Sequence, residues 1–396
     1  MELETLALLA LKILIVFGVA MTGCAYGVLL ERKVSAIIQD RVGPNRAPYP
    51  APIVMAVIGW VPVVGPFMAR VVGGTIGAIG NLVLRPLGFF QPIADGAKAF
   101  LKEDYTPAHV RPIYYWMAPM VAMLPAILVL AVLPFGSFVG AQKMVIADLD
   151  VGILFTFGIV SLSVYGVVLA GYAANSKYPF LGGIRSSAQM ISYEIAMGMS
   201  VVPVFMVVGS LNFSKVIEYQ GKHGWLVYPE GLGADLFIGA GLFVAFIIFF
   251  VCVLAETNRV PFDLPEAETE LVGGFNTEYG SMRFAMFFIG EYIAMIAGSA
   301  LVVILFLGGW TIPFLWEESA TTLGAGIGHI ISFIVKTAFV FFVIVWIRWM
   351  LPRFRYDQLM DLGWRRILPV ALANIVWTAA WMAYKYAGKT VEVAAS

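Results

Sequence analysis

The residues best suited to chemistry are carboxylates held in and beside long apolar segments. Residues 256–279 carry six carboxylates and one arginine, and apolar runs flank this stretch on both sides. Glu194 and Glu291 lie within apolar runs themselves. An ionisable side chain inside a bilayer costs on the order of 2.5 kcal/mol or more unless it faces protein or water. Carboxyl groups kept at that cost are typical of sites that take up and release protons.

A structural interpretation competes with the chemical one for each carboxylate. A buried carboxylate can simply pair with a nearby hydroxyl group or arginine. We favour proton exchange for Glu194 and Glu291, which lie inside their apolar runs. Glu31 and Glu256 lie at the ends of theirs and fit both interpretations equally well.

The composition predicts an all-α polytopic membrane protein. Of the 396 residues, 60% are hydrophobic and 13% charged, whereas roughly 25% of residues are charged in soluble proteins. Backbone polar groups cannot stay unpaired in lipid, and continuous apolar runs favour helices over a closed barrel. We expect eight membrane-spanning helices, at residues 5–30, 113–135, 151–174, 190–209, 236–256, 284–308, 329–351 and 366–387.

The distribution of basic residues predicts the orientation of these spans. Of the 25 Lys and Arg residues, eighteen lie in the odd-numbered connections, and only five lie in the even-numbered connections and the C-terminal tail. Because cytoplasmic connections are rich in Lys and Arg, the odd connections should face the cytoplasm and both termini the periplasm. Lys12 and Lys336 lie toward the outer side, and we expect their long side chains to reach the membrane surface.

Several classes of site are disfavoured by the sequence. Cys24 and Cys252 lie in separate apolar runs, so they cannot together provide the ligands of an iron–sulfur cluster or a structural zinc site. We therefore expect no metal site. A net charge of zero gives no signal for nucleic-acid binding. The first residues are acidic rather than basic, so we interpret the first apolar run as a retained span and not a signal peptide.

The long first connection, residues 31–112, is predicted to contain two membrane-associated elements. Asp95, Lys98 and Lys102 recur at helical spacing among apolar residues, which indicates an amphipathic helix lying in the membrane interface. Residues 47–90 are rich in Gly, Pro and apolar side chains. We expect them to form an extra interfacial or re-entrant hairpin.

The acidic connection, residues 257–283, is predicted to contain a short helix. Asp263 is followed three residues later by Glu266, the spacing of a capping box in which each side chain satisfies a backbone N–H group. Glu268 and Glu270 have no such structural explanation. Arginines such as Arg41 could neutralise these carboxylates, or could bind lipid phosphates instead.

Five motifs occur in one order on this topology: ERKVSAIIQDRVGPNR, QPIADGAKAFLKED, KYPFLGGIRSSAQMISYE, AETNRVPFDLPEAETELVGGFNTEYGSMRF and LPRFRYDQLM. Over nearly the whole chain they closely resemble the H subunit of bacterial respiratory complex I, a proton-pumping NADH–quinone oxidoreductase. This subunit is the counterpart of mitochondrial subunit 1. One departure is the segment from Ala47 to Phe90, where the family usually has only a few residues. We treat the chain as one integral membrane domain, residues 1–396.

The resemblance implies a function in quinone reduction and proton translocation. In this family the subunit forms a quinone chamber with the peripheral iron–sulfur and quinone-site subunits. It also contacts small membrane subunits, the antiporter-like membrane arm and lipid. The substrate would be ubiquinone or menaquinone. Flavin, iron–sulfur clusters and NADH would bind other subunits, so this chain alone would hold no complete active site. The implied location is the bacterial inner membrane.

The same resemblance assigns residues of this chain to roles. The quinone chamber and its access route fall on Glu31, Arg32, Asp40, Arg41, Asp95, Lys98, Arg259 and Phe262. An acidic route from the chamber to the membrane arm falls on Glu194, Glu256, Glu268, Glu270, Glu278 and Glu291. A basic patch before the last span falls on Arg348, Arg353 and Arg355.

Two other functions fit parts of the pattern. A homologous subunit of a membrane-bound hydrogenase would share the topology and bind no quinone. A proton-coupled secondary transporter would also keep carboxylates in its spans, but such transporters often show inverted repeats. The sequence shows no internal repeat, and its carboxylates gather toward one side.

Overall fold

The computed structural model describes residues 2–48, 81–82, 84–140, 142–227, 236–265, 268–312 and 322–395. The described residues form helices and one two-stranded antiparallel hairpin, in which β1 (Phe138–Val139) pairs with β2 (Gln142–Lys143). The prediction of an all-α protein is therefore confirmed. Most of the predicted 47–90 hairpin lies outside the described residues.

Eight helical segments of the described chain are long and apolar enough to cross a membrane. This confirms the predicted number and order of spans. The segments are built from α1 (Glu2–Ile38), α6 (Pro112–Leu130), α7 (Gly152–Val160), α8 (Ser163–Ala173), α9 (Lys177–Val208), α11 (Leu236–Glu256), α13 (Ser281–Phe306), α14 (Leu323–Met350), α15 (Tyr356–Asp361), the π-helix η3 (Leu362–Ile367) and α16 (Leu368–Ala395).

The largest boundary error concerns α9. We predicted a span beginning at residue 190, but the helix already begins at Lys177. Its first turns carry polar residues that lower the average hydropathy, yet these turns also pack closely on α8. A Cβ atom on Gly183 would lie 3.3 Å from the carbonyl oxygen of Val167. Glu194 consequently lies in the middle of α9 rather than one turn from its start.

Among the described residues, four shorter helical elements connect the spans: α5 (Gln91–Leu101), α10 (Phe213–His223), α12 (Glu268–Leu271) and the 3-10 turn η2 (Gly274–Asn276). The chain divides into two compact units. Unit 1 comprises Met1–Ala20, Thr106–Tyr279 and Met286–Ser396, and unit 2 comprises Met21–Tyr105 and Gly280–Ala285.

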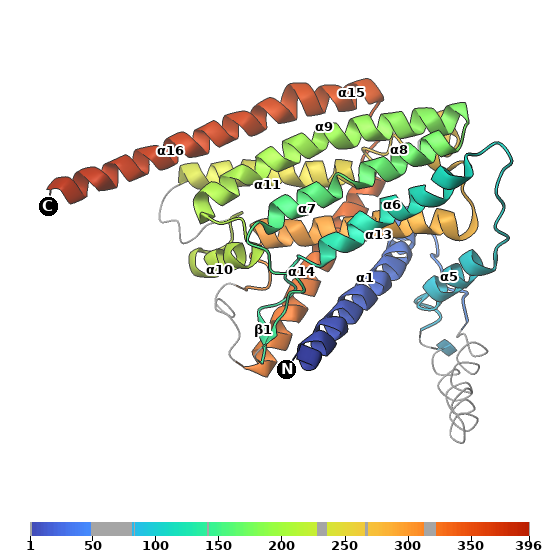
Figure 1. Ribbon diagram of the computed structural model, residues 1–396, viewed down its shortest axis with the longest axis horizontal. Coiled ribbons are helices and arrows are strands. Elements are labelled where there is room, and N and C mark those ends of the chain that lie inside the picture. The colour runs from blue at the N-terminus through green and yellow to red at the C-terminus, as the bar shows by residue number, and fades with distance from the viewer. Residues whose placement is uncertain are drawn as a thin grey trace, which may run out of the picture. The chain divides into compact units, whose positions relative to one another are not determined.

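Unit 1 is a bundle in which α9 runs beside α8, α11 and α16 (Figure 1). Small residues allow its backbones to approach closely. A Cβ atom on Gly166 of α8 would lie 2.4 Å from the backbone nitrogen of Ala122 on α6, so only glycine fits at that crossing. Close packing through small residues is a main source of helix association in membranes, where lipid is as apolar as the helices.

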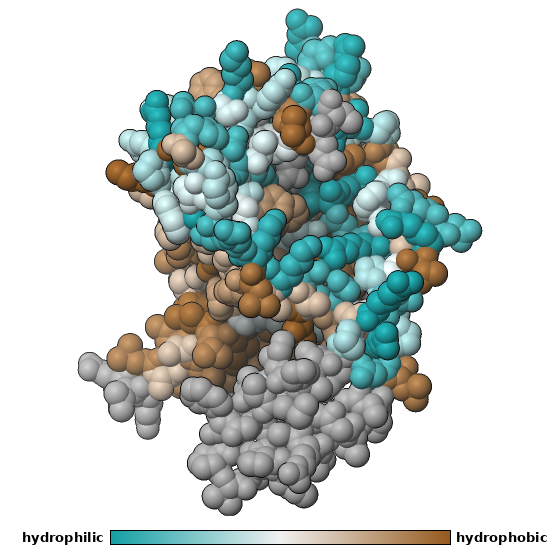
Figure 2. Space-filling view, turned by 90° about the vertical axis from the view of Figure 1, so that its right-hand side faces the viewer, coloured by the Kyte–Doolittle hydropathy of each residue, from teal (hydrophilic) through white to brown (hydrophobic). Residues whose placement is uncertain are grey.

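The sides of the bundle are apolar, as expected for a surface that faces lipid. Large hydrophobic side chains such as Ile113, Leu154, Tyr165 and Phe339 are more than half exposed. Hydrophilic side chains gather instead in the upper part of Figure 2, where the end of α8, the start of α9 and α15 lie (compare Figure 1). We call the end of unit 1 that carries residues 257–279 and 351–361 the acidic end.

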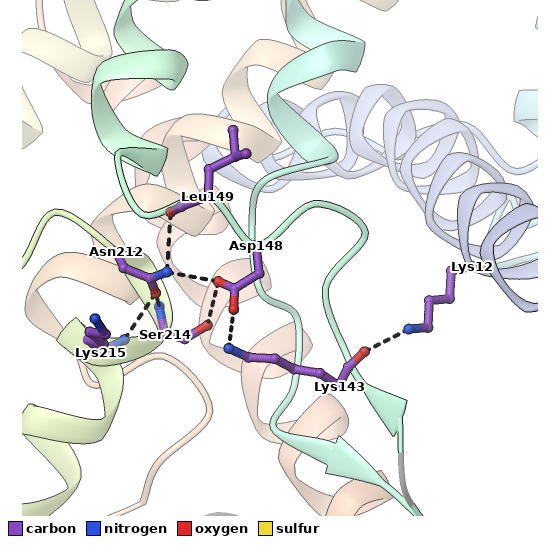
Figure 3. A network of polar contacts seen from close by, with 7 residues as sticks. All are labelled: Lys12, Lys143, Asp148, Leu149, Asn212, Ser214 and Lys215. Carbon is purple, nitrogen blue, oxygen red and sulfur yellow. Dashed lines mark hydrogen bonds and ion pairs between the residues drawn. The ribbon is translucent and has the colours of Figure 1, made fainter. Parts of the chain in front are cut away.

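The other end of unit 1, residues 132–150, 209–227 and 307–312, is called the opposite end. Its loops are joined by a network of polar contacts (Figure 3). The Asn212 carboxamide caps α10 by accepting hydrogen bonds from the backbone N–H groups of Ser214 and Lys215. Its amide group donates to Asp148 over 3.0 Å, and Lys143 forms an ion pair with the same carboxylate.

The electrostatics of Asp148 follow from this network. Burial opposes ionisation of the carboxyl group, but hydrogen bonds from Lys143, Asn212 and Ser214 and the charge of Lys143 hold the pKa of Asp148 below its ordinary value. Lys12 of α1 donates to the backbone carbonyl of Lys143 over 2.9 Å. The network therefore connects α1, the β-hairpin and α10.

Lys336 of α14 binds the backbone at the opposite end. Its ammonium group donates to the carbonyl oxygens of Leu307 and Gly309 at 2.8 and 3.2 Å, and also to that of Thr311. Its nitrogen also lies 4.4 Å from the ring centroid of Trp225. These carbonyls follow the C-terminus of α13, where the helix dipole favours a cation.

Unit 2 contains the predicted amphipathic helix. Residues 91–101 form α5, which has Asp95 and Lys98 at helical spacing and no buried residue. Arg32 of α1 forms an ion pair of 2.7 Å with Asp95, and Arg283 pairs with Asp104 at 2.6 Å. The Ser281 hydroxyl donates to the carbonyl of Lys102, which follows α5, over 2.9 Å.

Candidate functional site

A cavity inside unit 1 brings two of the predicted carboxylates together. Residues of α6, α7, α8, α9, α11 and α13 line it, and both Glu256 and Glu291 are among them. Most of the other lining side chains are apolar, for example Val253, Phe287 and Leu301. Because apolar walls provide no hydrogen bonds, the carboxyl groups are the strongest polar features of this space.

Glu256 is the C-terminal residue of α11. Both of its carboxylate oxygens are buried without a hydrogen-bond partner in the described protein. Glu194 of α9 is close enough for its charge to interact with that of Glu256. Two carboxylates that share a poorly solvated region compete for charge, so this pair is suited to holding and exchanging a proton.

Glu291 has an arginine beside it. The guanidinium of Arg259, which is 4% exposed, lies 3.5 Å from the carboxylate of Glu291. The same guanidinium lies 4.6 Å from the ring centroid of Tyr292. The resemblance assigned Arg259 to the chamber and Glu291 to the acidic route. The structure places the two side chains in contact.

The loop that carries Arg259 has a fixed course. Asn258 adopts a left-handed conformation with φ of 49°, which asparagine tolerates better than most residues. The Thr257 hydroxyl donates to the carbonyl of Val253 over 3.1 Å. Phe262 packs against Tyr193, with ring centroids 5.4 Å apart, and against Phe354 at 5.6 Å. The bond from Thr257 also satisfies a carbonyl in the last turn of α11, where carbonyls lack partners within the helix.

The predicted capping role of Asp263 is wrong. Residues 263–265 are not helical, and α12 begins only at Glu268. The Asp263 carboxylate instead accepts a hydrogen bond from Arg353 at 2.9 Å. Its proposed partner, Glu266, lies outside the described residues.

Asp263 occupies a different electrostatic environment from Asp148. Burial is the largest effect and raises the pKa of Asp263 above its ordinary value, while the charges of Arg353, Arg348 and Arg259 oppose that shift. Two members of the predicted basic patch, Arg348 and Arg353, thus act on this carboxylate. Arg355, the third, pairs with the exposed Asp357 at 2.6 Å.

Glu270 and Glu278 of the acidic loop are partly exposed. Glu270 pairs with Arg185 of α9 at 2.7 Å. Glu278 lies 3.5 Å from the imidazole of His109, and its carbonyl oxygen accepts a hydrogen bond of 2.7 Å from the Tyr115 hydroxyl. Glu268 begins α12, and its side chain lies outside the described residues.

The other predicted chamber residues belong to unit 2. Glu31 is buried, whereas Arg32 and Lys98 are exposed. Asp40 and Arg41 are exposed just beyond the end of α1. Within unit 2, Arg32 and Asp95 of this set form an ion pair.

Sequence reasoning missed Gln189 as a site residue. Its side chain is fully buried on α9, and its amide nitrogen lies within hydrogen-bond distance of the loop after α11. A signal was present in the sequence. Gln189 is the only residue with a carboxamide side chain between residues 177 and 208, and it lies one turn before Tyr193 and Glu194.

Comparison with known proteins identifies the family. A family model described as NADH dehydrogenase matches residues 50–379. The H subunit of NADH-quinone oxidoreductase from Leptospira biflexa is 40% identical over 393 residues, which cover 94% of this chain and 96% of the relative. The chain belongs to the H-subunit family of respiratory complex I.

Two further relatives agree. Subunit 8 of NADH-quinone oxidoreductase from Rhodothermus marinus is 41% identical over 358 residues, covering 89% of this chain and 90% of the relative. The H subunit from Syntrophotalea carbinolica is 40% identical over 387 residues, covering 97% and 98%. The chain is thus a multi-pass membrane subunit of a multisubunit oxidoreductase. The resemblance seen in the sequence is confirmed.

Proposed function

We propose that the chain forms, with peripheral subunits, the access route and chamber for a lipid quinone, and couples quinone reduction to proton translocation. The observation that carries this proposal is the apolar cavity of unit 1 that contains Glu256 and Glu291. The names of the relatives support a quinone as the substrate. These names favour a subunit of a quinone oxidoreductase over a subunit of a membrane-bound hydrogenase.

The side chains of the acidic end suggest how the coupling works. Reduction of a quinone takes up protons together with electrons, which reach it from cofactors held by other subunits. Glu256, with two unpartnered oxygens, can accept a proton when negative charge arrives nearby. Arg259 neutralises Glu291, so a change in local charge alters how strongly that pair is held.

The proposal extends to location and partners. The chain would lie in the bacterial inner membrane with both termini on the periplasmic side, so that the acidic end faces the cytoplasm. The iron–sulfur and quinone-site subunits of the peripheral arm would dock there. The small membrane subunits and the antiporter-like arm would contact the lipid-facing helices.

The test replaces carboxylates by amides. Glutamine keeps the size and the hydrogen-bonding capacity of glutamate but cannot exchange a proton. We expect Glu194→Gln and Glu291→Gln to assemble normally and to bind a quinone-site inhibitor. NADH-driven proton pumping in membrane vesicles, normalised to assembled complex, should fall severalfold in each variant.

The matched control is Glu218→Gln, because Glu218 is an exposed residue of α10 at the opposite end of unit 1 and has no role in the proposal. Pumping should stay near the unmodified level in this variant. Full pumping in both Glu194→Gln and Glu291→Gln would remove these glutamates from the mechanism.

A further inference from the structure

Gln189 connects α9 to the loop that follows α11. Its side-chain nitrogen lies 2.8 Å from the carbonyl oxygen of Ala255, in the last turn of α11, and 2.7 Å from that of Phe262. The same nitrogen lies 3.2 Å from the side-chain oxygen of Asn258. A carboxamide has two N–H donors, so the two carbonyls at the shorter distances use both of them.

The two carbonyls bracket the residues that place Arg259. Ala255 belongs to the end of the helix, and Phe262 lies three residues beyond Arg259 in the chain. A single side chain that holds both points fixes the path of the backbone between them. No other described side chain donates to both of these carbonyl oxygens.

Burial makes this connection strong. Gln189 is 0% exposed, and its side-chain oxygen has no hydrogen-bond partner among the described residues. A buried amide oxygen without a partner carries a desolvation cost. The hydrogen bonds from the side-chain nitrogen to Ala255 and Phe262 must therefore hold the side chain in this position, because its oxygen makes none among the described residues.

We propose that Gln189 is a positioning residue that sets the course of residues 255–262 and thereby holds Arg259 against Glu291. The hydrogen bonds of Gln189 go to Ala255, Asn258 and Phe262 rather than to either side chain of the pair, so it acts through the loop. This inference rests on the proposed function, in which the Arg259–Glu291 pair responds to quinone reduction.

The chain provides a matched control in Gln220 of α10. Gln220 is also buried, at 1% exposure, and donates to the carbonyl of Ile304 over 2.7 Å. Its oxygen accepts a hydrogen bond of 2.9 Å from the backbone N–H of Gly308. It connects two segments in the same manner as Gln189, but at the opposite end of unit 1.

The first measurement is hydrogen–deuterium exchange on the assembled complex. In Gln189→Met, which keeps the length of the side chain without its donors, the amides of Asn258, Phe262 and Leu264 should exchange at least tenfold faster. In Gln220→Met the faster exchange should be confined to residues 304–309. Unchanged exchange at 257–264 in Gln189→Met would overturn the positioning role, whatever the function of the loop.

The second measurement is a double-mutant cycle on quinone reductase activity. Because Gln189 acts through Arg259, Gln189→Met and Arg259→Met should each lower kcat severalfold with KM nearly unchanged, and the double variant should be no slower than Arg259→Met alone. Gln220→Met should leave kcat unchanged. Independent, multiplying effects in the double variant would overturn the inference.

The outcomes separate this inference from the proposed function. Normal activity in Arg259→Met would contradict the proposed role of the pair, while the exchange result would still decide the role of Gln189. A loss of activity in Arg259→Met but not in Gln189→Met would overturn only the positioning role. Should Gln189→Met fail to assemble, Gln189→Glu carries the same two measurements, because it keeps the volume and exchanges the donors for an acceptor.

Discussion

The two ends of unit 1 differ in how fully their buried polar groups are hydrogen-bonded. At the opposite end, Asn212, Gln220 and Lys336 each make several hydrogen bonds. The indole N–H of Trp225 has no acceptor among the described residues there, but its ring faces the Lys336 ammonium. At the acidic end, both oxygens of Glu256 have no hydrogen-bond partner in the described protein.

Other buried polar atoms at the acidic end also lack a hydrogen-bond partner in the described protein. One oxygen each of Gln189 and Asp263, and the Nε atom of Arg353, are buried without a hydrogen-bond partner among the described residues. Buried polar groups are normally satisfied, and each exception needs an explanation. Near the opposite end, the described groups without a partner, such as the Trp225 indole N–H and the Ser332 hydroxyl, are neutral. At the acidic end they include carboxylate oxygens, and we infer that this end keeps capacity for protons, water or partner subunits.

The sharpest way to break this comparison is Arg259→Met. It leaves Glu291 without its neighbouring cation, and removal of one member of a buried ion pair costs about 3–5 kcal/mol. We expect a marked fall in the thermal stability of the assembled complex together with the loss of activity described above. Lys143→Met at the opposite end should cost below about 1 kcal/mol, because that pair with Asp148 is partly exposed. Equal losses in the two variants would contradict the contrast.

Lys336→Met should have the next largest effect. The substitution removes a charged donor from the carbonyls after α13, and a hydrogen bond to a charged group contributes about 1.5–3 kcal/mol. The temperature of half-inactivation should fall while quinone reductase activity per assembled complex stays unchanged. A specific loss of turnover at normal stability would show that this end also takes part in function.

Asn212→Ala removes the N-cap of α10. Loss of such a cap costs typically about 1 kcal/mol, and here the link to Asp148 is lost as well. The control is Thr322→Ala, which removes the N-cap of α14 at an exposed position. Thermal unfolding followed by activity should show a larger shift for Asn212→Ala. A larger shift for Thr322→Ala would indicate that the network of Figure 3 adds nothing to the cap.

The smallest effects should differ in sign between two aspartates. The lowered pKa of Asp148 means that its contribution to stability is present above the ordinary value of 3.8 and is lost as the pH falls through the folded-state pKa. Asp263 has a raised pKa, so its ionised form costs stability at neutral pH, and that cost disappears as the pH falls toward 3.8.

The matching experiment measures thermal stability from pH 7 downward in Asp148→Asn and Asp263→Asn. At pH 7 the first variant should be less stable than the unmodified protein by about 1 kcal/mol or less, because solvent screens the partly exposed charge of Asp148. The second variant should be equally or more stable, because Asp263 is buried and its ionised form is disfavoured. The difference for Asp263→Asn should shrink as the pH falls toward 3.8, whereas the difference for Asp148→Asn should persist down to about that pH and shrink only below it. Differences of the same sign at pH 7 would refute the electrostatic distinction between the ends.

The sequence predicted the spans well because hydropathy is a property of the segment itself. All eight appear in the predicted order. The start of α9 was missed because its first turns are polar yet pack against α8, which no average over the segment can detect. The acceptors of Lys336 could not be predicted from the sequence for a related reason. They lie after α13, more than twenty residues away in the chain, and are positioned only by the fold.

The site was predicted in its residue types and only partly in its pairings. Glu256 and Glu291 were identified from their position in or beside apolar runs. The partnership of Arg259 with Glu291 depends on the loop conformation between α11 and α13, which the sequence alone does not determine. Asp263 fitted a local capping pattern, but a distant arginine, Arg353, binds it instead.

The glycine at the crossing of α6 and α8 has a consequence for inherited variation. Every codon change that alters Gly166 introduces at least a Cβ atom, which would lie 2.4 Å from the backbone nitrogen of Ala122. The backbone there cannot yield as a flexible side chain could, so the helices would have to separate. A missense allele at this position should therefore behave as a loss of the whole complex, although it alters no charged residue and lies outside every motif by which the family is recognised.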